Sequence, residues 1–157
     1  AFAVQNCTTF RMERGARRAN VEARILLALS VVTEAARAMM KGGQHFEVPA
    51  FARDRRVPVR FLNDVIEELV QFGLLGELSN MPGHFVLLKA PGTLPVKDIV
   101  RGIMQSGVEP QNLGLTGLDP RIERILAESD RSIEQSLNQT TVQDLLSGDE
   151  EKPVKNP

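Results

Sequence analysis

Apolar residues recur at helical spacing in several parts of the chain, and the segment 21–40 is apolar on most sides. Asn20 provides an N-cap for this segment, and Gly42 and Gly43 end it. A helix that is apolar all round must be covered all round. We therefore expect it to be the central helix of the core, the alternative being a subunit contact.

The clearest amphipathic helix is predicted from Pro58 to Phe72, with Gly73 as its C-terminal cap. Its apolar positions recur every three or four residues. They are Leu62, Val65, Ile66, Leu69 and Val70. Before it, the pattern indicates a short extended segment at 46–48 and a short helix over 50–55, introduced by Pro49.

Two apolar runs, 74–78 and 84–89, are separated by the Pro- and Gly-containing turn 79–83, which predicts a β-hairpin. Thr93 is the expected N-cap of a helix that ends at Gly107. Apolar residues at helical spacing give this helix a core face.

The last third begins with a Gly-, Pro- and Leu-rich stretch, 108–118, which is typical of a linker. Asp119 and Pro120 then start a helix that runs to Leu137 and is expected to pack on the preceding domain. Its apolar face consists of Ile122, Ile125, Leu126, Ile133 and Leu137. Thr141 and Asp144 open a final helical turn as a capping box.

This order of elements is that of a winged helix-turn-helix, so the fold class is mainly α (α+β), with a small β-hairpin as the wing and additional C-terminal helices. The expected organisation has four parts. They are a basic N-terminal arm (1–19), a winged-helix domain (20–107), a linker with C-terminal helices (108–147) and a disordered acidic tail (148–157).

The composition limits the disulfide, metal and catalytic chemistry that the chain can carry out. The chain has 157 residues, no Trp or Tyr, one cysteine (Cys7) and two histidines, His45 and His84. One cysteine forms no intramolecular disulfide, and these residues do not supply a Cys/His zinc site. The histidines are expected to be isolated, and no catalytic residue, metal or cofactor is expected. The longest uncharged apolar run, 25–33, is less than half a membrane span.

The net charge of −1 conceals a gradient, because residues 1–60 carry eleven Lys/Arg against five Asp/Glu, whereas residues 108–157 carry five against ten. The basic arm contains Arg11, Arg14, Arg17 and Arg18. A solvated arm, a membrane-proximal segment beside anionic lipid and a nucleic-acid contact are all compatible with it.

A second basic cluster surrounds the turn before the 58–72 helix, where cations could contact phosphates. The residues are Arg53, Arg55, Arg56 and Arg60, and Asn63 would join Arg60 as a base reader. The same helix continues with Asp64, Glu67 and Glu68, which would repel DNA, and the turn 79–83 has no Lys or Arg. Nucleic-acid binding is therefore less favoured on charge alone.

The segment from Val48 to Val100 resembles the Rrf2-like winged-helix pattern. The matching parts are Phe61-Leu62, Val65-Ile66, Leu69, Gly73-Leu74-Leu75, Gly83 to Leu87 and Asp98-Ile99-Val100. This resemblance covers about 60 residues. It implies a winged-helix DNA-binding regulator, without the iron–sulfur site because no cysteine lies near the wing.

The start of the chain resembles the exit from the last membrane helix of YihY/BrkB-type inner-membrane proteins, often labelled ribonuclease BN. The residues that carry this second resemblance are Ala1 to Asn6, Thr8 to Phe10, Arg14, Arg17 and Arg18. It implies the soluble C-terminal part of such a protein, at the cytoplasmic face of a bacterial inner membrane.

The two resemblances together favour a non-catalytic regulatory or interaction module. Its implied partners are its own membrane domain or another protein, the anionic membrane surface and a second copy of the chain. The alternatives are an Rrf2-like DNA-binding transcriptional regulator and, as a second alternative, part of a tRNA-processing ribonuclease.

Overall fold

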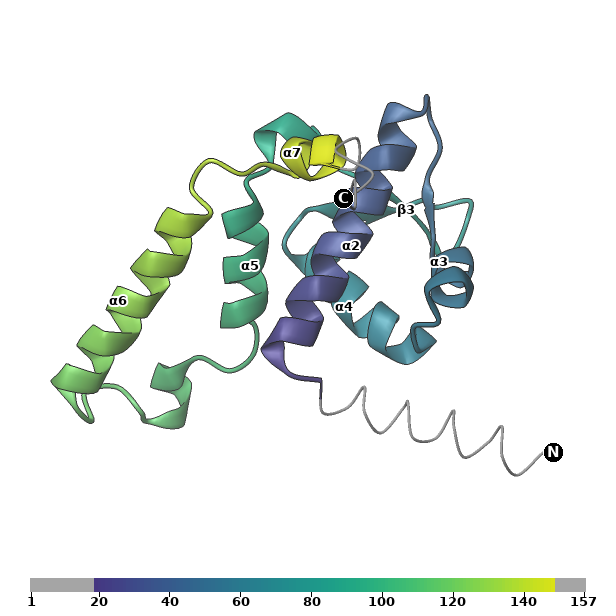
Figure 1. Ribbon diagram of the computed structural model, residues 1–157. Helices are drawn as coiled ribbons and strands as arrows, with labels where there is room; N and C mark the ends of the chain where they lie inside the picture. Colours follow the sequence, from purple (N-terminus) through teal and green to yellow (C-terminus); the bar gives the residue numbers. More distant parts are fainter. Residues whose placement is uncertain (1–18, 149–157) are drawn as a thin grey trace, which may run out of the picture.

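The computed structural model describes residues 19–148, and helix α2 (Val21–Met40) lies at their centre (Figure 1). The side chain of Asn20 accepts a hydrogen bond of 2.8 Å from the backbone N–H of Ala23, as its N-cap role requires. Six residues of α2 are buried: Leu27, Ala28, Val31, Val32, Ala35 and Ala36. The prediction of a central core helix is confirmed, but the helix is not covered on every side, because Leu26 is 69% and Met40 60% exposed.

The helix-turn-helix consists of α3 (Val48–Arg55) and α4 (Val59–Gln71). The connecting turn is tight, because Arg56 adopts the left-handed conformation with φ 54° and Pro58 disfavours continuation of the first helix. On α4, the predicted apolar stripe is buried at Leu62, Val65, Ile66 and Leu69, while Val70 is exposed.

The wing is formed by strands β2 (Leu75–Glu77) and β3 (His84–Leu87), and the predicted hairpin is confirmed. A third strand, β1 (Phe46–Glu47), pairs antiparallel with the other edge of β3, giving the strand order β1-β3-β2. The hairpin is thus part of a three-stranded sheet. Pairing of β1 is a long-range contact that a local pattern does not reveal.

Helix α5 (Val96–Gln105) follows a 3-10 turn over Pro91–Thr93. The prediction that Thr93 caps this helix is wrong. The N-cap is Pro95, and the Thr93 hydroxyl donates instead to the carbonyl of Ala90 at 2.8 Å. The backbone N–H of Val96 is satisfied by the carbonyl of Thr140 from the C-terminal segment.

The last helix, α7 (Val142–Ser147), belongs to the core of the winged helix. Val142 is completely buried and its backbone N–H donates to the carbonyl of Leu94 at 2.9 Å. The predicted capping box is present, because Thr141 and Asp144 exchange hydrogen bonds. This segment therefore covers α2 directly (Figure 1).

Helix α6 (Pro120–Ser136) starts at the predicted N-cap, Asp119, and stands beside α5 at one end of the molecule (Figure 1). The expectation that its apolar face packs on the domain is wrong for most of its length. Ile122, Ile125 and Leu126 are 57–61% exposed. Helical periodicity shows that a face is apolar but not what covers it.

The observed elements confirm a winged helix-turn-helix with additional C-terminal helices. Among residues 19–148, no helix is long and apolar enough to cross a membrane. Most of the expected basic arm and acidic tail lie outside the described residues. The division at residue 107 stays a prediction.

Candidate nucleic-acid interface

The outer face of α4 is the surface that a winged helix offers to a partner. Arg60 and Asn63, in its first turns, are exposed, and within the described residues neither makes a hydrogen bond or an ion pair. The N-terminus of α4 also lacks a side-chain cap, because its N-cap is Pro58. Unpaired N–H groups at a helix start favour anions.

Two further arginines flank the turn before α4. Arg53, near the end of α3, is exposed and only loosely paired, with 3.4 Å between its Nε and the Oδ1 of Asp54. Arg56, in the turn itself, is exposed and has no ion pair among residues 19–148. The structure thus brings Arg53, Arg56, Arg60 and Asn63 to one end of the helix-turn-helix.

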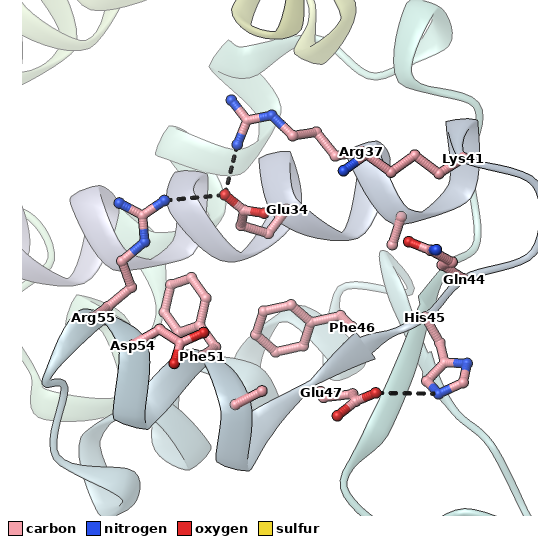
Figure 2. Close-up of a pocket in the computed structure, with 12 residues that line it drawn as sticks. Glu34, Arg37, Lys41, Gln44, His45, Phe46, Glu47, Phe51, Asp54 and Arg55 are labelled. Carbon is pink, nitrogen blue, oxygen red and sulfur yellow. Dashed lines mark hydrogen bonds and ion pairs between the residues drawn. The ribbon is translucent and has the colours of Figure 1, made fainter.

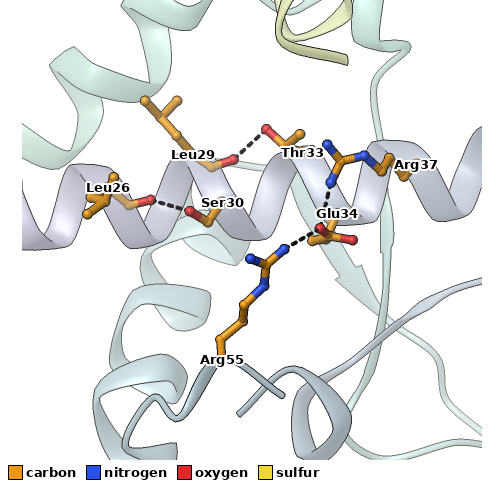
Figure 3. A network of polar contacts seen from close by, with 7 residues as sticks. All are labelled: Leu26, Leu29, Ser30, Thr33, Glu34, Arg37 and Arg55. Atoms are coloured by element: carbon orange, nitrogen blue, oxygen red, sulfur yellow. Dashed lines mark hydrogen bonds and ion pairs between the residues drawn. The ribbon is translucent and has the colours of Figure 1, made fainter. Parts of the chain in front are cut away.

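Arg55 has a different position from the other predicted site residues. Its guanidinium donates to Glu34 of α2 at 3.2 Å, and Arg37 donates to the same carboxylate oxygen at 2.6 Å (Figure 3). Arg55 therefore connects α3 to α2, whereas Arg60 is not engaged within the described chain.

The outer face of α4 carries less exposed negative charge than the sequence indicated. Glu68 was expected on the exposed face, but it is half-buried and pairs with Arg24 of α2, with 2.5 Å between the Nη2 and Oε1 atoms. Arg24 also donates to the hydroxyl of Ser106. Asp64 and Glu67 remain exposed, so the negative charge begins one turn beyond Arg60.

The wing turn is short and uncharged at its tip. The backbone N–H of Gly83 donates to the Oε1 of Glu77 at 2.8 Å, and Gly83 has a φ of 79°, which a residue with a side chain rarely adopts. Residues 79–83 contain no Lys or Arg. The positive charge of this surface is therefore concentrated at the turn and at the start of α4.

Beside the helix-turn-helix, an open cleft of about 620 Å³ separates the end of α2 from β1 and α3 (Figure 2). Its polar lining mixes both signs of charge and includes Arg37, Lys41, His45, Glu47 and Asp54. The mixed lining does not define one class of ligand.

The expectation that the two histidines are isolated is wrong. The ring centroids of His45 and His84 lie 4.6 Å apart, because β1 pairs directly with β3. One histidine precedes β1 and the other begins β3, so their proximity depends on the strand pairing that the local pattern did not reveal.

Two carboxyl groups of the described chain have lowered pKa values, and both cap helices away from α4. Hydrogen bonds from Arg121, through its side chain and its backbone, lower the pKa of Asp119. Hydrogen bonds from the backbone and hydroxyl of Thr141 lower the pKa of Asp144. These shifts are those of helix caps, where the charged carboxylate accepts hydrogen bonds.

Some polar contacts near the site join residues far apart in the chain and were not predicted. The pairs Arg24 with Glu68 and Arg55 with Glu34 join residues 44 and 21 positions apart. Charge alone does not show which cation meets which anion over such separations. For the histidines a signal existed, because His45 and Glu47 alternate with the apolar Phe46, as on one face of a strand.

No family model matches the chain, and no curated protein matches it by sequence. Solved structures do match its fold. IscR of T. potens aligns with a TM-score of 0.63 at 18% identity, over 86% of this chain and 91% of that one. The oxidized form of Staphylococcus aureus CymR aligns with a TM-score of 0.62 at 15% identity, over 86% and 99%.

CymR (YrzC), the global cysteine regulator of B. subtilis, aligns with a TM-score of 0.57 at 21% identity, over 80% of this chain and 95% of that one. At these identities the likeness concerns the fold. It confirms the winged helix expected from the Rrf2-like pattern, and it does not extend to the expected membrane-protein context.

Proposed function

We propose that the chain is a winged-helix DNA-binding regulator that places α4 in the major groove. The observation that carries this proposal is the exposed, unpaired Arg60 and Asn63 at the start of α4, in the position of a recognition helix. Arginine pairs with guanine and asparagine with adenine through two hydrogen bonds each, so both side chains suit base reading.

The phosphate contacts come from the turn. Arg53 and Arg56 are exposed beside the N-terminus of α4, where they would fix the register of the protein on the duplex. Pairing of Glu68 with Arg24 removes one of the negative charges that opposed this function. The regulators among the similar structures support the proposal through their fold.

The same proposal includes a dimer, in which a second copy of the chain binds through α6. The exposed apolar row of Ile122, Ile125 and Leu126 on α6 follows Leu118, which is 71% exposed. A self-complementary apolar helix is a typical two-fold contact, and a two-fold dimer presents two recognition helices to two half-sites. We infer that this row joins two chains.

The test of DNA binding begins with selection of preferred sites from a random duplex pool, followed by titration of a labelled duplex at several salt concentrations. Arg60→Ala should weaken binding to the selected site by about 1–3 kcal/mol and relax its sequence preference. Arg56→Ala should weaken binding to all sequences alike. It should also reduce, by about one, the magnitude of the slope of log affinity against log salt concentration.

The matched control is Arg131→Ala, which removes an exposed arginine from α6 without touching the helix-turn-helix. It should leave affinity and sequence preference unchanged. If no duplex is selected, or if Arg131→Ala and Arg60→Ala weaken binding equally, the recognition role of α4 is wrong.

A second candidate function is the regulatory or interaction module of a membrane protein that the sequence favoured. The exposed Asp64 and Glu67 on α4 and the uncharged wing turn support it. Its basic arm, Arg11, Arg14, Arg17 and Arg18, lies outside the described residues. Anionic vesicles should then bind the chain in a salt-sensitive way that is lost when these four arginines are changed to Gln, with no selective duplex binding.

A further inference from the structure

Three polar side chains share the outer face of the sheet at the base of the wing. Glu47 of β1 lies directly opposite His84 of β3, and His45 lies two residues before Glu47 on the same side of the chain. The alternate residues, Phe46 and Phe85, also face each other and are buried in the core. Strand register, and not a chance surface contact, therefore brings the three groups together.

The distances suit a ligand set that closes around an ion. The imidazole rings are arranged edge to face, with 4.6 Å between their centroids, and 3.8 Å separates the Nε2 of His45 from the Oε1 of Glu47. One ligand atom from each of the three residues lies within 4.8 Å of the others. Ligands of a tetrahedral zinc ion are about 3.4 Å apart, so modest side-chain rotation is required. Glu47 is half exposed and free to make it.

One atom of the cluster has an unmet hydrogen-bonding requirement. The Nδ1 of His84 is buried and has no hydrogen-bond partner among the described residues. Burial of a polar atom without a partner is unfavourable, and such atoms usually have a protein, water or ion partner. The cluster thus combines a geometric and an energetic indication of a missing ligand.

We propose that His45, Glu47 and His84 bind a divalent transition-metal ion of the Zn²⁺ class. Two imidazole nitrogens and one carboxylate oxygen form a ligand set that zinc uses, whereas Mg²⁺ and Ca²⁺ prefer oxygen ligands throughout. The partial exposure of the cluster leaves a coordination position for water. The expectation that no metal binds rested on two isolated histidines, whereas the pairing of β1 with β3 brings them together.

The site joins two parts of the DNA-binding unit. His45 and Glu47 immediately precede α3, and His84 immediately follows the wing turn, where the carbonyl of Gly83 already accepts from the N–H of Val48 at 3.0 Å. A bound ion would add a side-chain link to these backbone contacts and hold the wing against the helix-turn-helix. This consequence rests on the proposed function, whereas the metal site itself does not.

The experiment measures metal binding in the absence of DNA. The whole chain is stripped with a chelator and titrated calorimetrically with ZnCl₂, and with Co²⁺, whose visible absorption reports tetrahedral coordination. Cys7, outside the described residues, is changed to Ser throughout so that its thiol contributes nothing. We expect one ion per chain, and His45→Gln and His84→Gln should each lower the affinity by about tenfold or more.

The matched control is Glu67→Gln, which neutralises an exposed carboxylate on α4 and should leave the zinc affinity unchanged, whereas Glu47→Gln should lower it. Circular dichroism of each metal-free variant separates loss of a ligand from loss of the fold. In the Cys7→Ser chain, zinc should also shift the imidazole ¹⁵N resonances of both histidines. Absence of saturable binding, or binding that survives both histidine substitutions, would overturn the site.

Discussion

At the scale of single residues, Arg24 joins three helices through one guanidinium group. Arg24 lies on α2, and its side chain pairs with Glu68 on α4 and donates to the hydroxyl of Ser106 at the end of α5. The other carboxylate oxygen of Glu68, Oε2, is buried without a hydrogen-bond partner in the described chain. Glu68 therefore depends on Arg24 for compensation of its charge.

Arg24→Met, which keeps an apolar stem but removes the charge, should lower the free energy of unfolding by about 1–3 kcal/mol, because it leaves a half-buried carboxylate unpaired. Urea unfolding followed by circular dichroism measures the change. Arg121→Met removes an exposed, solvent-screened pair with Asp119 and should lower the free energy of unfolding by much less. Equal losses in the two variants would contradict the role of Arg24.

Gly102, within α5, lies close to the ring of Phe72, the C-cap residue of α4. A Cβ atom at this position would lie 2.9 Å from the Cε2 atom of Phe72. Alanine in a helix interior normally stabilises by about 1 kcal/mol relative to glycine. We expect Gly102→Ala to destabilise the wild-type chain but to stabilise a Phe72→Leu chain. A double-mutant cycle measures the difference, and the same effect in both backgrounds would exclude the contact.

At the scale of elements, α7 depends on its capping box. The pKa of Asp144 is lowered in the folded chain, so its carboxylate stabilises the fold at pH values above its unfolded pKa, and this contribution is lost as the pH falls through the lowered folded pKa. The stability difference between the wild type and Asp144→Asn should thus be present at pH 7 and shrink in acid.

Urea titrations of both proteins from pH 7 down to about pH 2 measure this difference. Asp130→Asn, on the exposed part of α6, is the matched control because Asp130 has no hydrogen bond among the described residues. A difference that stays constant with pH would show that the charge of Asp144 does not support α7.

The elements differ in how far the sequence could predict them. Helix starts at Asn20, Asp119 and Thr141 were predictable because a cap and its hydrogen bonds lie within one turn. The exposure of Arg60 and Asn63 followed from the apolar stripe on the other side of α4.

Features that depend on distant contacts were not predictable in the same way. The pairing of β1, the ion pair of Glu68 and the place of α7 in the core all join segments far apart in the chain. Local patterns indicate which groups need partners but not which partners they find.

At the scale of the whole molecule, the exposed row on α6 leads to a prediction about assembly. Ile125→Glu should convert the proposed dimer to a monomer, because a charge in the centre of a two-fold apolar contact meets its own copy or is buried unpaired. Sedimentation velocity over a range of protein concentrations measures the change.

The matched control is Gln135→Glu, which adds the same charge to an exposed position on another side of α6. It should leave the dimer intact. A wild-type chain that sediments as a monomer at all concentrations would contradict the proposed contact. A dimer that survives Ile125→Glu would place the contact elsewhere.

The packing of α7 on α2 has a consequence for synthesis of the chain. Helices α2 and α7, near the two ends of the described residues, pack together in one core. Val142 of α7 is completely buried there. A ribosome delivers the N-terminal side first, so α2 waits for its last covering helix during on the order of 10 s of elongation. The apolar surface of α2 that α7 covers therefore stays exposed on the nascent chain until residue 147 has emerged.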